Sequence, residues 1–188
     1  MTFFEQLTAI ELNILNWIQD VFSCAFLDWF FLLITKLGDH GIFWIAVAVI
    51  LLFFKKTRAT GIMMGVALLT GLLVCNVTLK PLIGRIRPYD TEGARNITLL
   101  VERLTDGSFP SGHTLASLEA ATVLLIRDKR CGIPAMIAAI LVALSRLYLY
   151  VHFPTDVLAG ALLGVLFAFF AVWIVKFVWK KTTGKELQ

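Results

Sequence analysis

Three groups of polar residues, far apart in the sequence, have the types and the spacing that phosphate chemistry requires. They are Lys80 with Arg87-Pro88, then Pro110-Ser111-Gly112-His113, and finally Ser145-Arg146 followed by His152 and Asp156. A guanidinium presents a planar fork of donors and an ammonium presents a compact charge, and both suit the oxygens of a phosphoryl group. We therefore expect Lys80, Arg87 and Arg146 to surround one phosphate.

The middle group adds a second kind of anion site. Ser111 and Gly112 precede an apolar run, so they are expected to open a helix. Free backbone N–H groups and the positive end of the helix dipole attract an anion at such a point. Gly112 has no side chain to obstruct a phosphate, and both residues are predicted to bind it.

Two histidines could share the chemical steps. His152 and Asp156 are four residues apart, and Pro154 is well placed to begin a helix. A carboxylate in that first turn could accept the N–H of the imidazole and leave the other ring nitrogen free to attack phosphorus. His113 would then protonate the leaving group as a general acid. Phosphoryl transfer needs mainly positioning and charge stabilisation, which three cations supply, so neither a metal nor another cofactor is expected.

These residues lie in a chain that is mostly apolar. Of its 188 residues, 59% are hydrophobic and 16% are charged, against roughly 25% charged in an average globular protein. Apolar runs recur along nearly the whole length, which predicts an all-α, polytopic membrane protein and argues against a water-soluble domain. Cys24, Cys75 and Cys131 are far apart and are interpreted as small hydrophobic residues.

The apolar pattern predicts one interfacial helix and six spanning helices. An amphipathic helix is predicted over residues 3–22, where apolar residues recur at three- and four-residue steps with polar residues such as Glu11 between them. We expect this helix to lie along the membrane interface, with packing against the other helices as an alternative that does not exclude it. The expected spans are 21–37, 41–55, 60–79, 112–127, 133–151 and 155–178. We expect one membrane-embedded domain, 1–188, which consists of the interfacial helix 1–20, a six-helix core 21–179 with an outer loop 80–110, and a cytoplasmic tail 180–188.

Basic residues predict the orientation of these helices. Lys and Arg are frequent at 55–58, at 127–130 and in the tail, and six crossings place all three regions on one side, which should be the cytoplasm. The loop 80–110 then faces outward. Counting crossings places Lys80, His113 and His152 at that same outer face, although the three are far apart in the sequence.

Several other charged residues are given structural interpretations. Arg85, Arg95 and Arg103 are interpreted as loop or interfacial charges, and His40, in a tight connection, is not expected to bind a ligand. Asp28 and Lys36 are costly inside a span, so each is expected to have a structural partner that the sequence does not identify.

At the three polar groups the chain resembles the type-2 phosphatidic acid phosphatase superfamily, which includes lipid phosphate phosphatases and, more distantly, vanadium haloperoxidases. The matching stretches are Lys80 to Pro88, Pro110 to His113, and Ser145 to Asp156. The resemblance implies a six-helix core, with His152 as nucleophile, Asp156 as its partner and His113 as acid. It places phosphate on Lys80, Arg87, Ser111, Gly112 and Arg146. Tyr150 departs from the pattern, since many members have glycine two residues before the nucleophile.

The resemblance implies a metal-independent membrane phosphatase that hydrolyses a lipid phosphomonoester or diphosphate through a phosphohistidine. Small size and bare loops are similar to bacterial members, so we expect a multi-pass protein of a bacterial cytoplasmic membrane with its site on the extracytoplasmic face. Undecaprenyl diphosphate and phosphatidylglycerophosphate are the substrates that we expect, and the sequence does not choose between them. The alternatives are a haloperoxidase-like enzyme, which the lack of a large soluble portion disfavours, and an anion transporter, in which a nucleophile–carboxylate pair would be superfluous. Nucleic acid is not expected as a partner, and the oligomeric state cannot be predicted.

Overall fold

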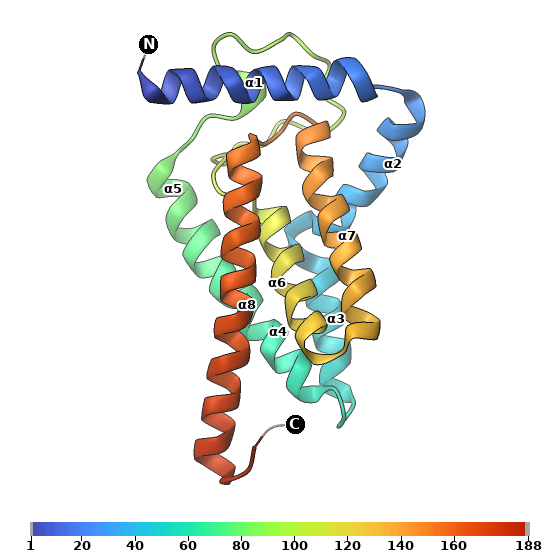
Figure 1. The fold of residues 1–188 in the computed structure, drawn as a ribbon, viewed down its shortest axis with the longest axis vertical. Coiled ribbons are helices and arrows are strands. Elements are labelled where there is room, and N and C mark those ends of the chain that lie inside the picture. Colours follow the sequence, from blue (N-terminus) through green and yellow to red (C-terminus); the bar gives the residue numbers. More distant parts are fainter. Residues whose placement is uncertain (1, 187–188) are drawn as a thin grey trace.

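The structure, a computed structural model, describes residues 2–186, and every regular element in that part of the chain is helical. One helix lies across the upper end of a bundle whose other helices run mainly along its long axis (Figure 1). Four helical segments among the described residues are long and apolar enough to cross a membrane: Ala25–Phe53, Arg58–Asp90, Lys129–Tyr148 and Pro154–Thr183. The expectation of an all-helical membrane protein is thus confirmed.

The helix across the upper end is α1 (Phe3–Phe22). Its first turn is capped reciprocally, because the Thr2 hydroxyl accepts a hydrogen bond from the Glu5 N–H and the Glu5 carboxylate accepts one from the Thr2 N–H. Part of the apolar stripe predicted for this helix is exposed, at Ile10, Ile14, Trp17 and Val21. Glu11, which the sequence places among the polar residues of the helix, is buried.

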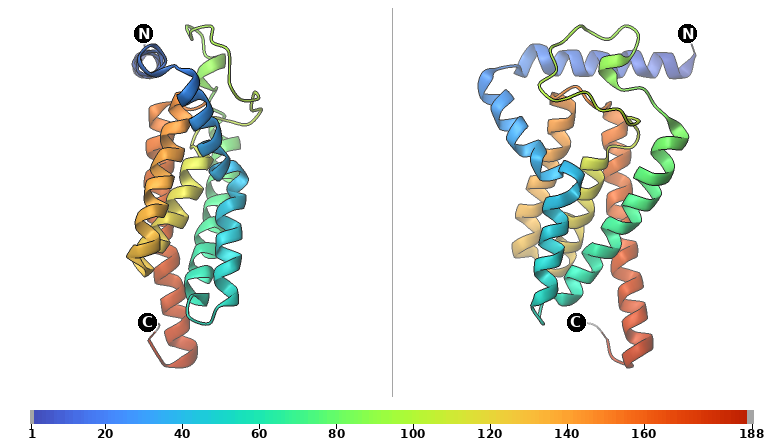
Figure 2. Two further views of the ribbon diagram at one scale, coloured as in Figure 1. Left: turned by 90° about the vertical axis from the view of Figure 1, so that its right-hand side faces the viewer. Right: turned by 180° about the vertical axis from the view of Figure 1, so that it is seen from behind.

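The chain then descends through α2 (Ala25–Thr35), a short 3-10 segment η1 (Lys36–Gly41) and α3 (Ile42–Phe53), all in one direction (Figure 2). Here the structure differs from the prediction of two spans, 21–37 and 41–55, because both belong to the single candidate span Ala25–Phe53. His40 and Gly41 have positive φ angles of 49° and 67°, which interrupt the helix locally. The chain bends instead of reversing, and η1 packs against α6 at the bend.

The return path is one long helix of three parts: α4 (Arg58–Gly71), the wider π-helical segment η2 (Leu72–Leu79) and α5 (Lys80–Ile83). It rises to the end where α1 lies (Figure 2). Gly84 ends it with a φ of 58°, the left-handed conformation in which many helices terminate. Lys80 therefore lies near the upper end of this helix, as the sequence predicts for the third span.

The next helix, α6 (Gly112–Arg127), has the limits predicted for the fourth span and is the central helix of the bundle. It packs against α3, α4, α7 (Lys129–Tyr148) and α8 (Pro154–Thr183). Its close approach to α8 depends on glycine, because a Cβ at Gly160 or Gly164 would lie 2.7 or 2.8 Å from a backbone oxygen of Ser111 or Leu115. This spacing of small residues permits tight helix packing in membranes.

The outer loop between α5 and α6 crosses the upper end of the bundle beside α1 (Figure 1). It contains a short 3-10 turn, η3 (Pro88–Asp90). The Tyr89 hydroxyl closes the loop on itself, since it donates to the Leu104 oxygen at 3.1 Å and accepts from the Leu104 N–H at 3.0 Å. The loop and α1 together cover the end of the bundle where the three polar groups converge.

Candidate active site

His152 lies in the turn between α7 and α8, and Asp156 lies in the first turn of α8. Both side chains are buried, and His152 Nδ1 is 3.6 Å from Asp156 Oδ2. Ser108 reaches the same point from the outer loop, where its hydroxyl donates to Asp156 Oδ2 and lies 3.5 Å from His152 Nδ1. The backbone N–H of Phe153 also donates to Oδ2, at 2.8 Å. Asp156 is thus held with Oδ2 toward the imidazole.

The second ring nitrogen of His152 faces the cations of the site, with Nε2 3.4 Å from Arg87 Nη1. Burial is the main cause that lowers the pKa of His152 to about 3. The hydrogen bond with Asp156 opposes this shift, and the charges of Arg146 and Arg87 add to it. The imidazole is therefore neutral near pH 7, which is the form that a nucleophile requires.

Lys80 and Arg87 are joined by a carboxylate of the outer loop. Asp106 accepts a hydrogen bond from Lys80 Nζ at Oδ2 and one from Arg87 Nη2 at Oδ1, the latter at 2.7 Å. Arg87 is also fixed by the backbone oxygen of Val151, to which Nη1 donates at 2.8 Å. Burial would raise the pKa of Asp106, but the hydrogen bonds and charges of Lys80 and Arg87 outweigh it and hold the pKa at about 2. The two cations therefore already bind one anionic group of the protein.

Arg146 approaches the site from α7 and is buried. Its Nη1 donates to the hydroxyl of Thr35, at the end of α2. Its Nε has no hydrogen-bond partner among residues 2–186. A buried donor without a partner is costly, and a phosphate oxygen at this position would remove the cost.

Ser111 and Gly112 begin α6, as predicted, but only Gly112 lines the cavity. The Ser111 hydroxyl lies 3.0 Å from Thr114 Oγ1, and its N–H donates to the Asp156 backbone oxygen at 3.0 Å. The Ser111 N–H is therefore used within the protein, and a phosphate contact of its hydroxyl stays a prediction. Ser111 connects the start of α6 to the start of α8.

His113, in the first turn of α6, has a carboxylate partner that the sequence did not reveal. Its Nε2 lies 2.9 Å from Oδ1 of Asp39, on the bend η1. A Cβ at Gly38 would lie 2.7 Å from His113 Cδ2, so the glycine provides room for the ring. The bend between α2 and α3 therefore supports the position of His113. The only signal in the sequence was an acidic residue between two glycines in a break between apolar runs.

These side chains surround one cavity of about 1190 Å³. Its polar end is lined by five predicted site residues and by Asp106, which the structure adds. The five are Lys80, Arg87, His113, Arg146 and His152. The cavity continues between α3 and α4 along apolar side chains that include Ile45, Val49, Leu68 and Leu72. The structure thus joins a cationic end, near the outer loop, to an apolar groove along the helices.

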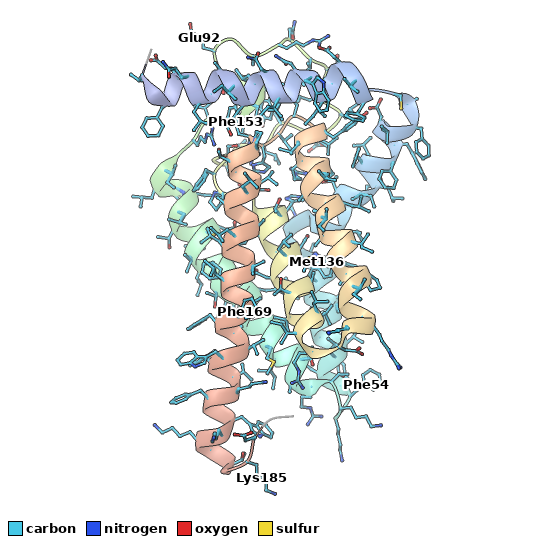
Figure 3. The ribbon with its side chains drawn as sticks, viewed as in Figure 1. Phe54, Glu92, Met136, Phe153, Phe169 and Lys185 are labelled. Carbon is cyan, nitrogen blue, oxygen red and sulfur yellow. The ribbon has the colours of Figure 1, made fainter. Side chains whose placement is uncertain are left out.

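Arg85 differs from its interpretation as a loop charge. Its Nη1 donates to Asp156 Oδ1 at 2.6 Å, and its Nη2 donates to Glu11 Oε2 at 2.6 Å. Its guanidinium carbon also lies 4.1 Å from the centre of the Phe153 ring, and Phe153 lies directly under α1 (Figure 3). These partners are 71 and 74 positions away in the sequence, so no local spacing could have revealed them.

Three other charged residues, Arg95, Arg103 and Asp28, behave as the sequence indicated. Arg95 pairs with Asp20 and Arg103 pairs with Asp90, all on the exposed surface. Asp28 accepts a hydrogen bond from the Tyr148 hydroxyl, which is a structural partner of the expected kind. Within residues 2–186, no group of three His, Cys, Asp or Glu side chains is placed to hold a metal ion.

A buried histidine–carboxylate pair whose cavity is also lined by Lys80, Arg87 and Arg146 is suited to phosphoryl transfer. The sequence profile of the PAP2 superfamily matches residues 59–180, and the chain belongs to this superfamily. The family resemblance inferred from the three polar groups is thereby confirmed, as is the expectation of a membrane lipid phosphate hydrolase.

Relatives and a solved structure agree with this membership. The undecaprenyl-diphosphatase of Sulfolobus acidocaldarius is 38% identical over 152 residues, which cover 80% of this chain and 71% of that protein. Phosphatidylglycerophosphatase B of Bacillus subtilis is 35% identical, with 72% of this chain and 69% of that protein covered. The crystal structure of a transmembrane PAP2-type phosphatidylglycerolphosphate phosphatase from Bacillus subtilis has a TM-score of 0.69 and 28% identity, and the match covers 97% of this chain and 89% of that one.

Proposed function

We propose that the protein hydrolyses a phosphomonoester or diphosphate of a lipid with His152 as the nucleophile. The observation that carries the proposal is the placement of this imidazole. Nδ1 faces Asp156, Nε2 faces Arg87, and the cavity beyond becomes apolar between α3 and α4. A phosphate at the cationic end would have its lipid chain in the groove.

The proposed reaction has two halves. His152 Nε2 attacks phosphorus, the bond to the lipid oxygen breaks, and Asp156 stabilises the imidazolium that forms. His113 protonates the departing oxygen. Charge on the transferring group is stabilised by Lys80, Arg87, Arg146 and the N-terminus of α6 at Gly112. A water molecule, deprotonated by His113, then attacks the phosphohistidine and releases inorganic phosphate.

The proposed substrates are undecaprenyl diphosphate and phosphatidylglycerophosphate. The names of two relatives support both, an undecaprenyl-diphosphatase and a phosphatidylglycerophosphatase. Each lipid presents phosphate at the membrane surface and an apolar chain below it, which is the order of the cavity from its cationic end to its groove.

We further propose five crossings, by α2–α3, α4–α5, α6, α7 and α8, with α1 along the extracytoplasmic interface of a bacterial cytoplasmic membrane. The basic regions 55–58, 127–130 and 180–185 support this orientation. In Figure 3, Phe54 and Lys185 lie toward the lower end, whereas Phe153 and Glu92 lie at the upper end. With 16 residues, α6 is about 24 Å long, so His113 would lie below the membrane surface.

The test is phosphate release by the purified protein from the two lipids, from phosphatidic acid and from a water-soluble phosphomonoester. We expect hydrolysis of the lipids, and a loss of ~10⁴-fold or more in His152→Ala. Wild-type protein quenched in alkaline denaturant should carry a base-stable, acid-labile phosphoryl label that His152→Ala lacks. Phosphate release at the wild-type rate by His152→Ala would overturn the mechanism, and no preference for lipids over the soluble ester would overturn the substrate class.

A further inference from the structure

The middle of α1 carries a buried carboxylate. Glu11 is 2% exposed, although Ile10 beside it is exposed. Glu11 Oε1 accepts hydrogen bonds from the N–H and the hydroxyl of Thr155, at 2.9 and 2.7 Å. Glu11 Oε2 accepts one from Arg85, at 2.6 Å. A buried charge is tolerated when it is paired and hydrogen-bonded, and these partners meet that requirement for Glu11.

Arg85 connects this carboxylate to the proposed catalytic pair. One arm of its guanidinium binds Glu11 Oε2 and the other binds Asp156 Oδ1, each at 2.6 Å. The other oxygen of Asp156, Oδ2, accepts from Ser108 and from the Phe153 N–H and faces His152. The two oxygens of Asp156 therefore have different partners, and Arg85 prevents the carboxylate from rotating away from the imidazole.

The charge of Arg85 also affects how strongly Asp156 can support His152. An arginine bound to Asp156 alone would draw the negative potential of that carboxylate away from the imidazole. Because Glu11 shares the same guanidinium, part of that potential remains at Oδ2, where the imidazolium forms during attack. The residues that line the cavity within the described chain include neither Glu11 nor Arg85, so both act behind the pair rather than on the substrate.

We propose that Glu11 and Arg85 are positioning residues for the His152–Asp156 pair, so that α1 is a working part of the active site as well as a surface helix. The inference rests on the proposed role of His152 as nucleophile. The contact lies in the middle of α1, where the side chain of Glu11 reaches from the helix to Thr155 at the start of α8.

The test uses full-length Glu11→Gln, Arg85→Gln and the double variant, with kcat and KM measured on one lipid phosphate. We expect Glu11→Gln to lower kcat ~10-fold and to change KM less than ~2-fold, because the loss affects the transition state and not substrate binding. Arg85→Gln should lose more, since it leaves Glu11 and Asp156 without their shared cation. The double variant should be more active than Arg85→Gln, because it also removes the uncompensated carboxylate.

The chain offers a matched control on the same helix and the same loop. Asp20 of α1 pairs with Arg95 of the outer loop, but the two side chains are 60% and 50% exposed and neither contacts Asp156 or lines the cavity. Asp20→Asn and Arg95→Gln should keep the kcat and KM of the wild type. The amount of phosphohistidine formed in the initial burst, per protein chain, gives the fraction of folded active sites. Dividing the turnover rate by this fraction gives a kcat that does not depend on how much of each variant is folded.

The outcomes separate this inference from the proposed function. Wild-type kcat in Glu11→Gln, or a double variant whose loss equals the product of the single losses, would overturn the positioning role. If His152→Ala kept its activity, the proposed function itself would fail. An inactive His152→Ala together with an unaffected Glu11→Gln would leave the function standing and remove only the role of α1.

Discussion

His113 Nε2 lies 2.9 Å from Oδ1 of Asp39, a carboxylate that the bend between α2 and α3 brings to the first turn of α6. The other histidine of the site, His152, also has a carboxylate partner, Asp156. The two pairs differ in their surroundings, because the side chain of Asp39 is 50% exposed and that of Asp156 is fully buried. The buried pair suits a nucleophile held in one tautomer, and the accessible pair suits a group that exchanges protons with water.

Replacing Asp39 should therefore affect proton donation by His113 to the leaving group more than the attack of His152 on phosphorus. We expect Asp39→Asn to lower the pre-steady-state rate of phosphohistidine formation ~10- to 100-fold on a lipid phosphate, whose alcohol must be protonated as it leaves. On p-nitrophenyl phosphate, whose leaving group needs no proton, the loss should be less than ~3-fold. Asp90→Asn, which removes an exposed carboxylate of the outer loop, serves as the control. Equal losses of Asp39→Asn on both substrates would contradict a role in protonation.

The anionic partner of Lys80 and Arg87 leads to a prediction about affinity. Asp106→Asn removes the charge that occupies both cations, so inorganic phosphate should inhibit the variant ~3- to 10-fold more strongly than the wild type. Since the pKa of Asp106 is held at about 2, the carboxylate stays ionised and the ratio should be constant between about pH 5 and 8. Glu92→Gln, elsewhere on the same loop (Figure 3), should not change inhibition. Weaker inhibition of Asp106→Asn would mean that Asp106 organises the cations instead of competing for them.

Burial of neutral His152 predicts a dependence of stability on pH. The pKa of His152 is about 3 in the folded protein, against 6.5 for a histidine exposed to water, as in the unfolded chain. Between these two pH values the unfolded chain therefore binds a proton that the folded chain does not. The stabilisation is present above pH 6.5 and is lost as pH falls toward 3, by at most about 1.4 kcal/mol per pH unit. The unfolding midpoint in detergent should therefore fall less in His152→Asn than in the wild type between about pH 7 and 5. An identical fall in both proteins would contradict a neutral buried His152.

Chelation tests the expectation that side-chain cations, without a metal ion, stabilise the charge on the transferring phosphoryl group. The charge on a transferring phosphoryl group can be stabilised by arginine and lysine alone, and Lys80, Arg87 and Arg146 all approach the cavity. We expect phosphate release to be unchanged after dialysis against excess EDTA. Loss of activity that returns on adding a divalent ion would contradict a metal-independent reaction.

The sequence predicted the parts of the site that short motifs encode. Counting the crossings predicts that the helix ends that carry these motifs lie on one face of the membrane. The structure agrees, because one cavity is lined by Lys80, Arg87, His113, Arg146 and His152. The limits of α6 also followed from the apolar run between Gly112 and Arg127. Both inferences use information that is local in the sequence or that depends only on the number of crossings between helix ends.

Two features were beyond that kind of reasoning. Hydropathy shows where a helix is interrupted at Gly38–Gly41 but carries no information about the direction of the next helix, so the bend was interpreted as a reversal. Ion pairs such as Glu11–Arg85 join residues 74 positions apart, and nothing in the spacing of either residue indicates the other. The sequence pattern places Glu11 among the polar residues of an amphipathic helix, whereas the protein buries it.

The packing of Gly38 against His113 gives a last prediction, on geometry alone. A Cβ at Gly38 would lie 2.7 Å from His113 Cδ2 and 3.0 Å from Val142 Cγ1, so Gly38→Ala should displace the imidazole by a fraction of an ångström. Small displacements of a catalytic group can cost up to ~100-fold in rate, and we expect kcat to fall ~10-fold or more with an intact fold. Gly65→Ala is the control for kcat, since a Cβ at Gly65 would meet nothing within 4 Å and Gly65 lines the apolar groove rather than contacting His113. Wild-type kcat in Gly38→Ala would mean that His113 tolerates movement and that its position on the bend is not critical for protonation.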